Sequence, residues 1–335
     1  MSNRRILALG LSAVGLLTLA ACSSQDPTAP APPTASSPMS SGTNHSAMGG
    51  KAININNAIL SELDKLEDKL GVPALSDKIQ ASRPYGNVEE LVAKKVVTQA
   101  QFDRIKDMVT VEDVRLTGEA KDIDYMTKLG LMKGHLLVAK ELLDLKKPDR
   151  AEPHIGHPVE EIYADVEDQL NERKVKEFKT SLIALQDLVK AGAKDPAKVD
   201  AEFKASVQSV EGAIARVPDA QRKDPKFVLQ VINGLLDTAN AEYGAAIADG
   251  KISQEIEYQD SRGFVAYANE LYKGIATTLA KDSPAAHKAI TASMATLSKA
   301  WPSPLPPAAP AMTADEVSKL VKTIEVNAQR SSQPS

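Results

Sequence analysis

The segment VDAEFKASVQSVEGAIARV, residues 199–217, decides the fold class. Its apolar residues recur at steps of four, four, three, four and three; they are Val199, Phe203, Val207, Val210, Ile214 and Val217. This spacing places all of them on one face of an α-helix, whereas a strand would need alternation at every second residue. A helix of this kind gains most of its stability by packing that face against other helices. The segment therefore predicts an all-α fold.

Similar patterns lie on both sides, separated by glycine and proline residues that end helices. One helix is expected over 122–145. Another begins at Pro158, which suits the first position of a helix, with His157 as the cap residue. The apolar spacing carries this helix as far as Leu185, and further helices follow up to Trp301.

These boundaries predict how the chain is divided. We expect residues 117–301 to form an antiparallel helical bundle with short loops. The sequence PSPLPPAAP then predicts an extended, proline-rich spacer over 302–312. A last helix over 313–329 begins at Thr313, which has the spacing of a capping box with Glu316. The apolar face of this helix is expected to pack on the bundle or to bind a partner.

Composition and charge exclude some classes of function. Aromatic residues make up only 4% of the chain, and helix-forming residues dominate. The chain has 40 basic and 44 acidic residues, and removal of Arg4 and Arg5 with a signal peptide leaves 38 − 44 = −6. This balance does not fit a protein whose main partner is nucleic acid. The single cysteine, Cys22, excludes a disulfide within the chain.

Residues 52–111 are expected to form a small domain of four short helices. Its capping signals include Asn56 or Asn57, Asn87, and Thr98 with Gln101 three residues further on.

The motifs IN.N at 53–56, SRPYGNVEELV at 82–92 and F.RIK at 102–106 resemble paired helix-hairpin-helix modules. Modules of this kind occur in the competence protein ComEA and the photosystem II extrinsic protein PsbU. In DNA-binding members each hairpin is a Gly-hydrophobic-Gly turn whose amides face a phosphate. Here Pro73 stands in place of the second glycine of the first hairpin, and the second hairpin, 94–98, has no glycine.

Like the missing glycines, the net charge of this region argues against DNA binding. Residues 51–111 contain nine basic and nine acidic residues, so 9 − 9 = 0, whereas a DNA-gripping module needs a basic excess. The resemblance thus leaves two functions open for the module, which are protein docking and DNA capture at the cell envelope.

The first 21 residues have the pattern of a bacterial signal peptide, with two arginines, an apolar run and small residues before Cys22. The sequence Leu19-Ala20-Ala21-Cys22 resembles a lipoprotein signal, which implies that Cys22 carries the lipid and anchors the protein to a membrane. Residues 22–51 have the composition of a disordered tether rich in Pro, Ser and Ala. Ser23 after the lipidated cysteine implies the periplasmic face of the outer membrane.

The strongest candidate for chemistry lies between Met132 and Glu161, where three of the five histidines gather. We interpret five residues there as candidate metal ligands, namely His135, His154, His157, Glu160 and Glu161. Such a set suits a Zn, Fe or Cu ion and does not select among them by ligand type. The same residues also fit a structural interpretation, with His157 as a helix cap, the glutamates as partners of the helix dipole, and His135 as a hydrogen-bonded core residue.

The spacing His157-x-x-Glu160 is similar to the motif of imelysin-like periplasmic iron-uptake proteins, although that family has a glycine where this chain has Ile155. Phosphate-loop, nucleophile-elbow and zinc-protease motifs do not occur in the sequence. We therefore expect a lipid-anchored periplasmic binding or scaffold protein, without enzymatic activity, that binds a metal ion or a metal-bearing ligand. The alternatives are an envelope DNA-binding protein and a purely structural adaptor with an envelope protein partner.

Overall fold

The computed structural model describes residues 52–58, 60–111 and 116–331, and these residues form an all-α protein, as the apolar spacing predicts. Within them, extended structure is limited to two pairs of two-residue strands. One pair is parallel and the other is antiparallel. The strands are β1 (Ile53–Asn54) with β2 (Val109–Thr110), and β3 (Ile247–Ala248) with β4 (Lys251–Ile252).

Residues 52–111, here called the N-terminal subdomain, have a hydrophobic core of their own. The pairing of β1 with β2 brings the two ends of this subdomain together. The capping box at Thr98 is present, because Thr98 Oγ1 accepts the Gln101 N–H and the Gln101 side chain accepts the Thr98 N–H. The helices are α1 (Leu60–Leu70), α2 (Leu75–Ala81), α3 (Glu90–Ala93) and α4 (Gln99–Ile105), followed by the short 3₁₀ helix η1 (Lys106–Met108).

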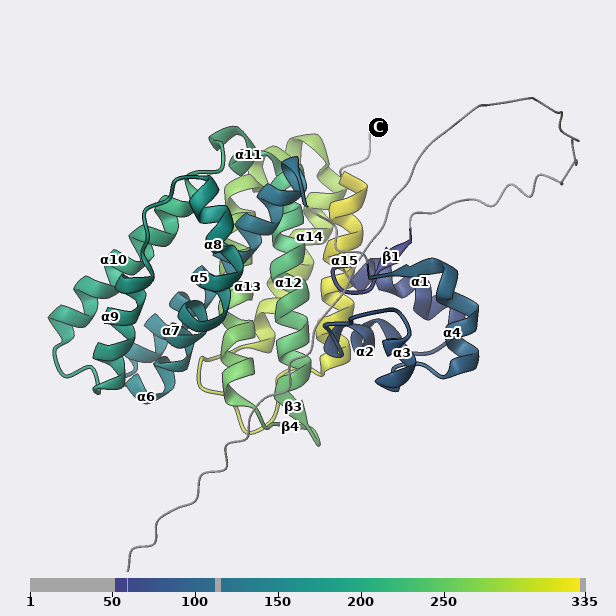
Figure 1. Cartoon of the computed structure of the whole chain (residues 1–335), viewed down its shortest axis with the longest axis horizontal. Helices are drawn as coiled ribbons and strands as arrows, with labels where there is room; N and C mark the ends of the chain where they lie inside the picture. Colours follow the sequence, from purple (N-terminus) through teal and green to yellow (C-terminus); the bar gives the residue numbers. More distant parts are fainter. Residues whose placement is uncertain (1–51, 59, 112–115, 332–335) are drawn as a thin grey trace, which may run out of the picture. The chain divides into compact units, whose positions relative to one another are not determined.

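The remaining helices share a second, larger core. The first group is α5 (Gly118–Asp144), α6 (Pro148–Ala151), α7 (Pro153–His157), the π-helix η2 (Pro158–Ile162), α8 (Tyr163–Glu172), α9 (Lys179–Lys190), α10 (Pro196–Ile214) and α11 (Asp219–Lys223). The second group is α12 (Pro225–Ala246), α13 (Glu255–Asp282), α14 (Pro284–Leu297), the 3₁₀ turn η3 (Ser298–Ala300) and α15 (Ala314–Ser331). Figure 1 shows both groups.

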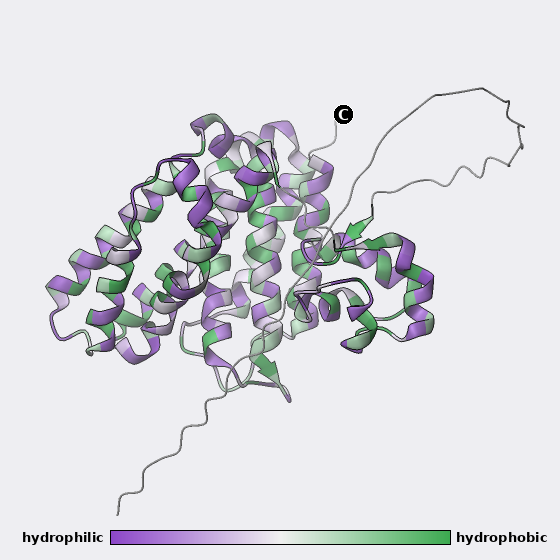
Figure 2. Ribbon diagram, in the orientation of Figure 1, coloured by the Kyte–Doolittle hydropathy of each residue, from purple (hydrophilic) through white to green (hydrophobic). Residues whose placement is uncertain are grey.

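Four of these helices form a bundle. Helix α12 packs against α13 and α15, and α14 packs against the same two helices, so the four close around one core. Figure 2 shows that each helix carries both apolar and polar residues, and most of the large apolar side chains are buried. Helix α5 packs against α12 and α13 and joins this bundle to the preceding helices.

The prediction of one helix from Pro158 to Leu185 is wrong, because α8 ends at Glu172. Lys174 has a φ of 54°, and the Val175 N–H donates to the Leu170 carbonyl, which is the pattern of a Schellman stop. This position is usually occupied by glycine, so a lysine there gives no sequence signal.

The proline-rich segment after Trp301 lies against the bundle. Tyr258 Oη donates to the Ser303 carbonyl at 3.0 Å, and Tyr243 Oη donates to the Met312 carbonyl at 2.7 Å. The capping box that opens α15 is present, with the Thr313 N–H donating to Glu316 at 2.8 Å. Among the described residues, no helix has both the length and the apolar character needed to span a bilayer.

Candidate metal centre

Three histidines converge on one buried carboxylate, that of Asp260. The nearest Asp260 oxygen lies 3.2 Å from His135 Nε2, 2.6 Å from His154 Nδ1 and 3.2 Å from His157 Nδ1. The histidines come from α5 and α7, whereas Asp260 comes from α13. The cluster thus joins the four-helix bundle to the helices that precede it.

Close contact between α5 and α13 brings these groups together. A Cβ atom on Gly134 would lie 2.7 Å from the Phe264 ring and 2.9 Å from the backbone of Gly263, so only glycine fits. His135 follows Gly134 directly, and its ring packs edge-on against Phe264 with centroids 4.9 Å apart. The close approach of the two backbones therefore sets the distance between His135 and Asp260.

An ion pair also joins the same two helices. Arg262 of α13 binds Glu141 of α5 through two parallel hydrogen bonds of 2.6 and 3.0 Å. Paired contacts of this kind between a guanidinium and a carboxylate fix direction as well as distance. They hold α5 and α13 in register beside the histidine cluster.

The Asp260 carboxyl group is ionised despite its burial. Its side chain is only 5% exposed, and this burial alone raises its pKa. The charge of His135 and hydrogen bonds from the three imidazoles outweigh burial and hold the pKa far below the usual range of an aspartate. The cluster therefore contains a buried anion surrounded by nitrogen atoms.

His157 has a different role from the helix cap that the sequence predicted. Its backbone is helical, and its side chain makes no capping hydrogen bond, because α7 continues directly into the π-helix η2. The imidazole turns to Asp260 instead and remains 31% exposed. Single turns of π-helix inside α-helices often occur at functional sites, since they redirect one or two side chains.

The donor set fits a metal ion. The ligand atoms of His135, His157 and Asp260 all lie within 4.8 Å of one another. Ligand atoms around a tetrahedral ion with bonds of about 2.1 Å are roughly 3.4 Å apart. His135 Nε2 lies 3.2 Å from Asp260 Oδ1 and His157 Nδ1 lies 3.2 Å from Asp260 Oδ2, so each of these histidines faces a different oxygen of the carboxylate. His135 Nδ1 lies 2.9 Å from the Leu131 carbonyl, to which it donates, so Nε2 is the nitrogen directed at the site.

The structure brings together His135, His154 and His157 of the residues that the sequence singled out. Glu160 is exposed and makes none of the contacts given for the cluster. Glu161 lies in η2, and its side chain lies outside the described residues.

Sequence reasoning missed Asp260, which is the centre of the cluster. It lies in the run Gln259-Asp260-Ser261-Arg262, and four consecutive polar residues occupy all sides of a helix. The available signal was a run of four polar residues between Tyr258 and Gly263. It does not indicate that Gln259, Asp260 and Ser261 are buried, nor which of them faces the histidines.

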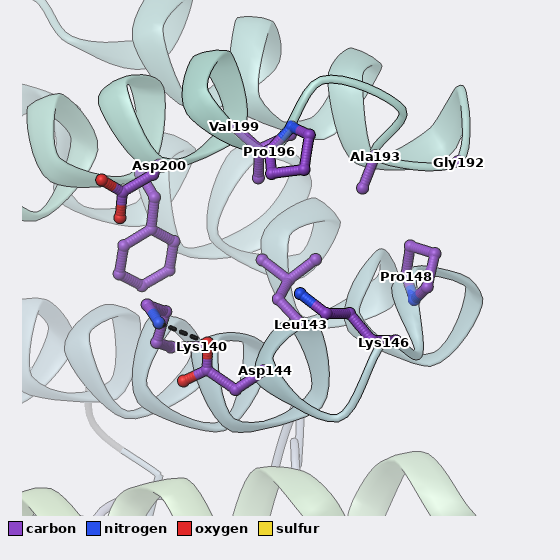
Figure 3. A pocket seen from close by; sticks show the side chains of 11 residues that line it. Lys140, Leu143, Asp144, Lys146, Pro148, Gly192, Ala193, Pro196, Val199 and Asp200 are labelled. Atoms are coloured by element: carbon purple, nitrogen blue, oxygen red, sulfur yellow. Dashed lines mark hydrogen bonds and ion pairs between the residues drawn. The ribbon is translucent and has the colours of Figure 1, made fainter.

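A separate cavity of about 380 Å³ lies between the end of α5, the loop before α10 and the first turns of α10 (Figure 3). Leu143, Val199 and Phe203 contribute its apolar surface. Lys140 and Asp144 at its edge form an ion pair of 2.6 Å. None of the three clustered histidines lines this cavity, so it is distinct from the candidate metal centre.

The first hairpin of the N-terminal subdomain already contains an anion. The Glu67 carboxylate accepts hydrogen bonds from the Ala74 and Ser76 N–H groups and from Ser76 Oγ, at 3.1, 3.2 and 2.9 Å. Lys322 of α15 in turn donates to Ser76 Oγ at 2.9 Å and pairs with Asp64 at 2.8 Å. The amides that a phosphate would need at this hairpin are therefore occupied by the protein's own side chain.

Comparison with known families gives one match. Residues 218–335 match the model of the iron permease-associated 4-helix bundle domain. The matched range contains α12, α13, α14 and α15, and so contains Asp260, whereas His135 and His157 precede it. No curated protein and no solved structure matches the chain.

Proposed function

We propose that this protein is a non-enzymatic binding protein that holds a metal ion at His135, His157 and Asp260. The observation that carries the proposal is the geometry of these ligand atoms, which lie within 4.8 Å of one another around an ionised, buried carboxylate. Burying a carboxylate is costly unless opposite charge or hydrogen bonds compensate it. In the absence of an ion, the imidazoles supply this compensation, and a metal ion held by His135 and His157 would supply the positive charge in their place.

Iron is the ion we propose first. Two histidines and one carboxylate on one side of an ion, with the other positions open, form the ligand set of non-haem Fe(II) sites. The similarity of residues 218–335 to an iron permease-associated domain supports the same ion. Zn²⁺ and Cu²⁺ also accept imidazole and carboxylate ligands, so both belong in the comparison.

We also propose that the protein works at the periplasmic face of the outer membrane, anchored by a lipid on Cys22. Support comes from the sequence alone, because Cys22 lies outside the described residues. A protein in that place that binds iron reversibly could deliver it to, or receive it from, an iron transporter in the envelope.

A metal titration tests the proposal. The fragment 51–335, purified without a tag, would be titrated with Fe²⁺ under anaerobic conditions and separately with Zn²⁺ and Cu²⁺. We expect one equivalent of iron to bind with a rise in melting temperature, since a ligand that binds only the folded state stabilises it. Less than a tenth of an equivalent of any of these ions, with no thermal shift, would refute the proposal.

The matched variants are His157→Ala and His287→Ala. His287 contacts Tyr272 Oη at 2.9 Å on α13 and lies outside the candidate ligand set. We expect His157→Ala to lose at least tenfold in metal affinity and His287→Ala to bind like the wild type. Equal loss in both variants would point to nonspecific binding by exposed imidazoles.

For the N-terminal subdomain we propose a packing role rather than DNA capture. Glu67 fills the first hairpin, and Asp77 accepts hydrogen bonds from Asn240 and Ser318 of the bundle. Binding of a labelled DNA duplex should therefore be absent at physiological salt. Submicromolar, salt-sensitive binding that disappeared on deletion of residues 51–111 would favour the DNA alternative instead.

A further inference from the structure

A second layer of hydrogen bonds lies behind the Asp260 carboxylate. His154 is fully buried; its Nδ1 faces Asp260 Oδ1 at 2.6 Å, and its Nε2 faces Gln259 Oε1 at 2.8 Å. Both ring nitrogens are therefore occupied by oxygen atoms of α13. His154 holds the carboxylate in place, and neither of its nitrogens is directed at a metal ion between His135 and His157.

The orientation of the Gln259 amide follows from its other contacts. Its Nε2 donates to Glu255 Oε1 and to the Pro304 carbonyl, both at 2.9 Å. Both of these atoms are acceptors, so the amide nitrogen must face them and the amide oxygen must face His154. Consequently His154 Nε2 must carry a hydrogen. The Gln259 side chain thus fixes the rotation of the His154 ring.

Pro304, which accepts a hydrogen bond from Gln259, belongs to the segment 301–305. Other hydrogen bonds also attach this segment to α13. We call it the strap. Trp301 Nε1 donates to Ser261 Oγ at 2.8 Å, Arg262 donates to the Trp301 carbonyl, and Tyr258 donates to Ser303. Four of the five residues from 258 to 262 therefore contact the strap, and the fifth, Asp260, faces the histidines.

We infer that Gln259 is a positioning residue of the metal centre. Glu255 and the Pro304 carbonyl orient Gln259, Gln259 orients His154, and His154 holds the carboxylate that faces the ion. This inference rests on the proposed function. Hydrogen-bonding partners of metal ligands typically change affinity by about 10- to 100-fold when they are removed.

Gln259→Met tests the inference, because methionine has a similar length but neither donates nor accepts a strong hydrogen bond. The matched control is Tyr258→Phe, which removes a strap hydrogen bond without touching His154. Fragment 51–335 would be titrated with Fe²⁺ and with Co²⁺, whose visible absorption reports coordination geometry. We expect Gln259→Met to bind both ions about 10- to 100-fold more weakly, with an altered Co²⁺ spectrum. Tyr258→Phe should bind within threefold of the wild type with an unchanged spectrum.

One further measurement and one further variant exclude a general structural effect. Trp301 is the single tryptophan of the chain and belongs to the strap, so its emission reports whether the strap is seated. If Gln259→Met does not fold, Gln259→Asn replaces it, since the shorter amide cannot reach His154 and Pro304 together, and the same loss of affinity is expected.

The outcomes separate the two proposals. Wild-type affinity and an unchanged Co²⁺ spectrum in a folded Gln259 variant would overturn the positioning role alone and leave the proposed function standing. An equal loss of affinity in Tyr258→Phe would also overturn it, because the effect would then come from the strap as a whole. Absence of binding in the wild type would overturn both proposals.

Discussion

A Cβ atom added to Gly263 would lie only 2.2 Å from the carbonyl oxygen of Gly134, so α5 and α13 touch through their backbones. Real Cβ atoms do not approach a backbone oxygen this closely, and neither backbone can move aside as a flexible side chain would. Asp260 lies one turn before Gly263, and His135 directly follows Gly134. The separation of the two helices at this point therefore controls the geometry of the candidate metal centre.

Gly263→Ala should separate the helices and weaken the site. Overpacking of this kind typically costs about 1–3 kcal/mol, and metal affinity should fall with it. Urea unfolding and Fe²⁺ titration measure the two effects. Gly274→Ala is the control on the same helix, because a Cβ there meets nothing within 4 Å. That control should be neutral or gain up to about 1 kcal/mol from helix propensity. Equal stability of both variants would contradict the close contact.

Asp260→Asn should abolish metal binding and destabilise the protein. It leaves three imidazoles facing an amide, and loss of one partner of a buried charge pair costs about 3–5 kcal/mol. Urea unfolding at pH 7 and at lower pH checks the result.

The pH dependence of this effect has a definite sign. The pKa of Asp260 is lowered on folding, so its contribution to stability is fully present above the unfolded pKa of about 4. The contribution is lost progressively as the pH falls below that value. The stability difference between the wild type and Asp260→Asn should therefore shrink below pH 4, and a difference that grew there would contradict the assignment.

The fold class was predictable because helix packing leaves a local trace in the sequence. The stripe from Val199 to Ile214 is the apolar face of α10, with Val199, Phe203, Val210 and Ile214 buried, and Val217 is buried just after the end of the helix. Helix ends were less predictable where a residue other than glycine adopts the left-handed conformation that ends the helix. Lys174 and Lys146 both adopt the left-handed conformation that usually selects glycine, with φ of 54° and 58°.

The candidate site was only half predictable. Its histidines lie close together in sequence, but Asp260 lies 103 positions after His157 and meets it through tertiary packing. The carboxylates nearest in sequence were the expected partners, yet Glu160 is exposed. Local spacing indicates which residues share a helix face. It does not indicate which distant helix supplies the remaining ligand.

Cys22→Ser tests the membrane anchor. It removes the single thiol of the chain and leaves the charge and the apolar run of the signal intact. We expect the wild type to fractionate with membranes and Cys22→Ser to remain in the supernatant. Both should show the same helical circular dichroism, since the described fold begins at residue 52. Retention of the serine variant in salt-washed membranes would show that lipidation at Cys22 is not the anchor.

The contact between Arg83 and Asp237 links the N-terminal subdomain to α12 and should make stability depend on pH. Arg83 Nη1 lies 3.4 Å from Asp237 Oδ2, and Arg83 also donates to the Ile55 and Ala58 carbonyls. Burial raises the pKa of Asp237 to about 6, although the charge of Arg83 opposes the shift. The folded state thus binds this proton more tightly than the unfolded state, whose aspartates titrate near 4.

This shift favours folding while Asp237 is protonated, and the advantage is lost as the pH rises through 6. Between pH 5 and pH 7 the contribution of Asp237 to the free energy of unfolding should fall by about 1 kcal/mol. The asparagine in Asp237→Asn cannot titrate, so the free energy of unfolding of this variant should lack the decrease that Asp237 causes. The histidines contribute equally to the pH dependence of both proteins. Urea unfolding at pH 5, 6 and 7 gives the free energy of unfolding of both proteins. The change with pH in the difference between the wild type and Asp237→Asn is the contribution of Asp237. A difference that stayed constant over this range would mean that Asp237 remains ionised beside Arg83 throughout.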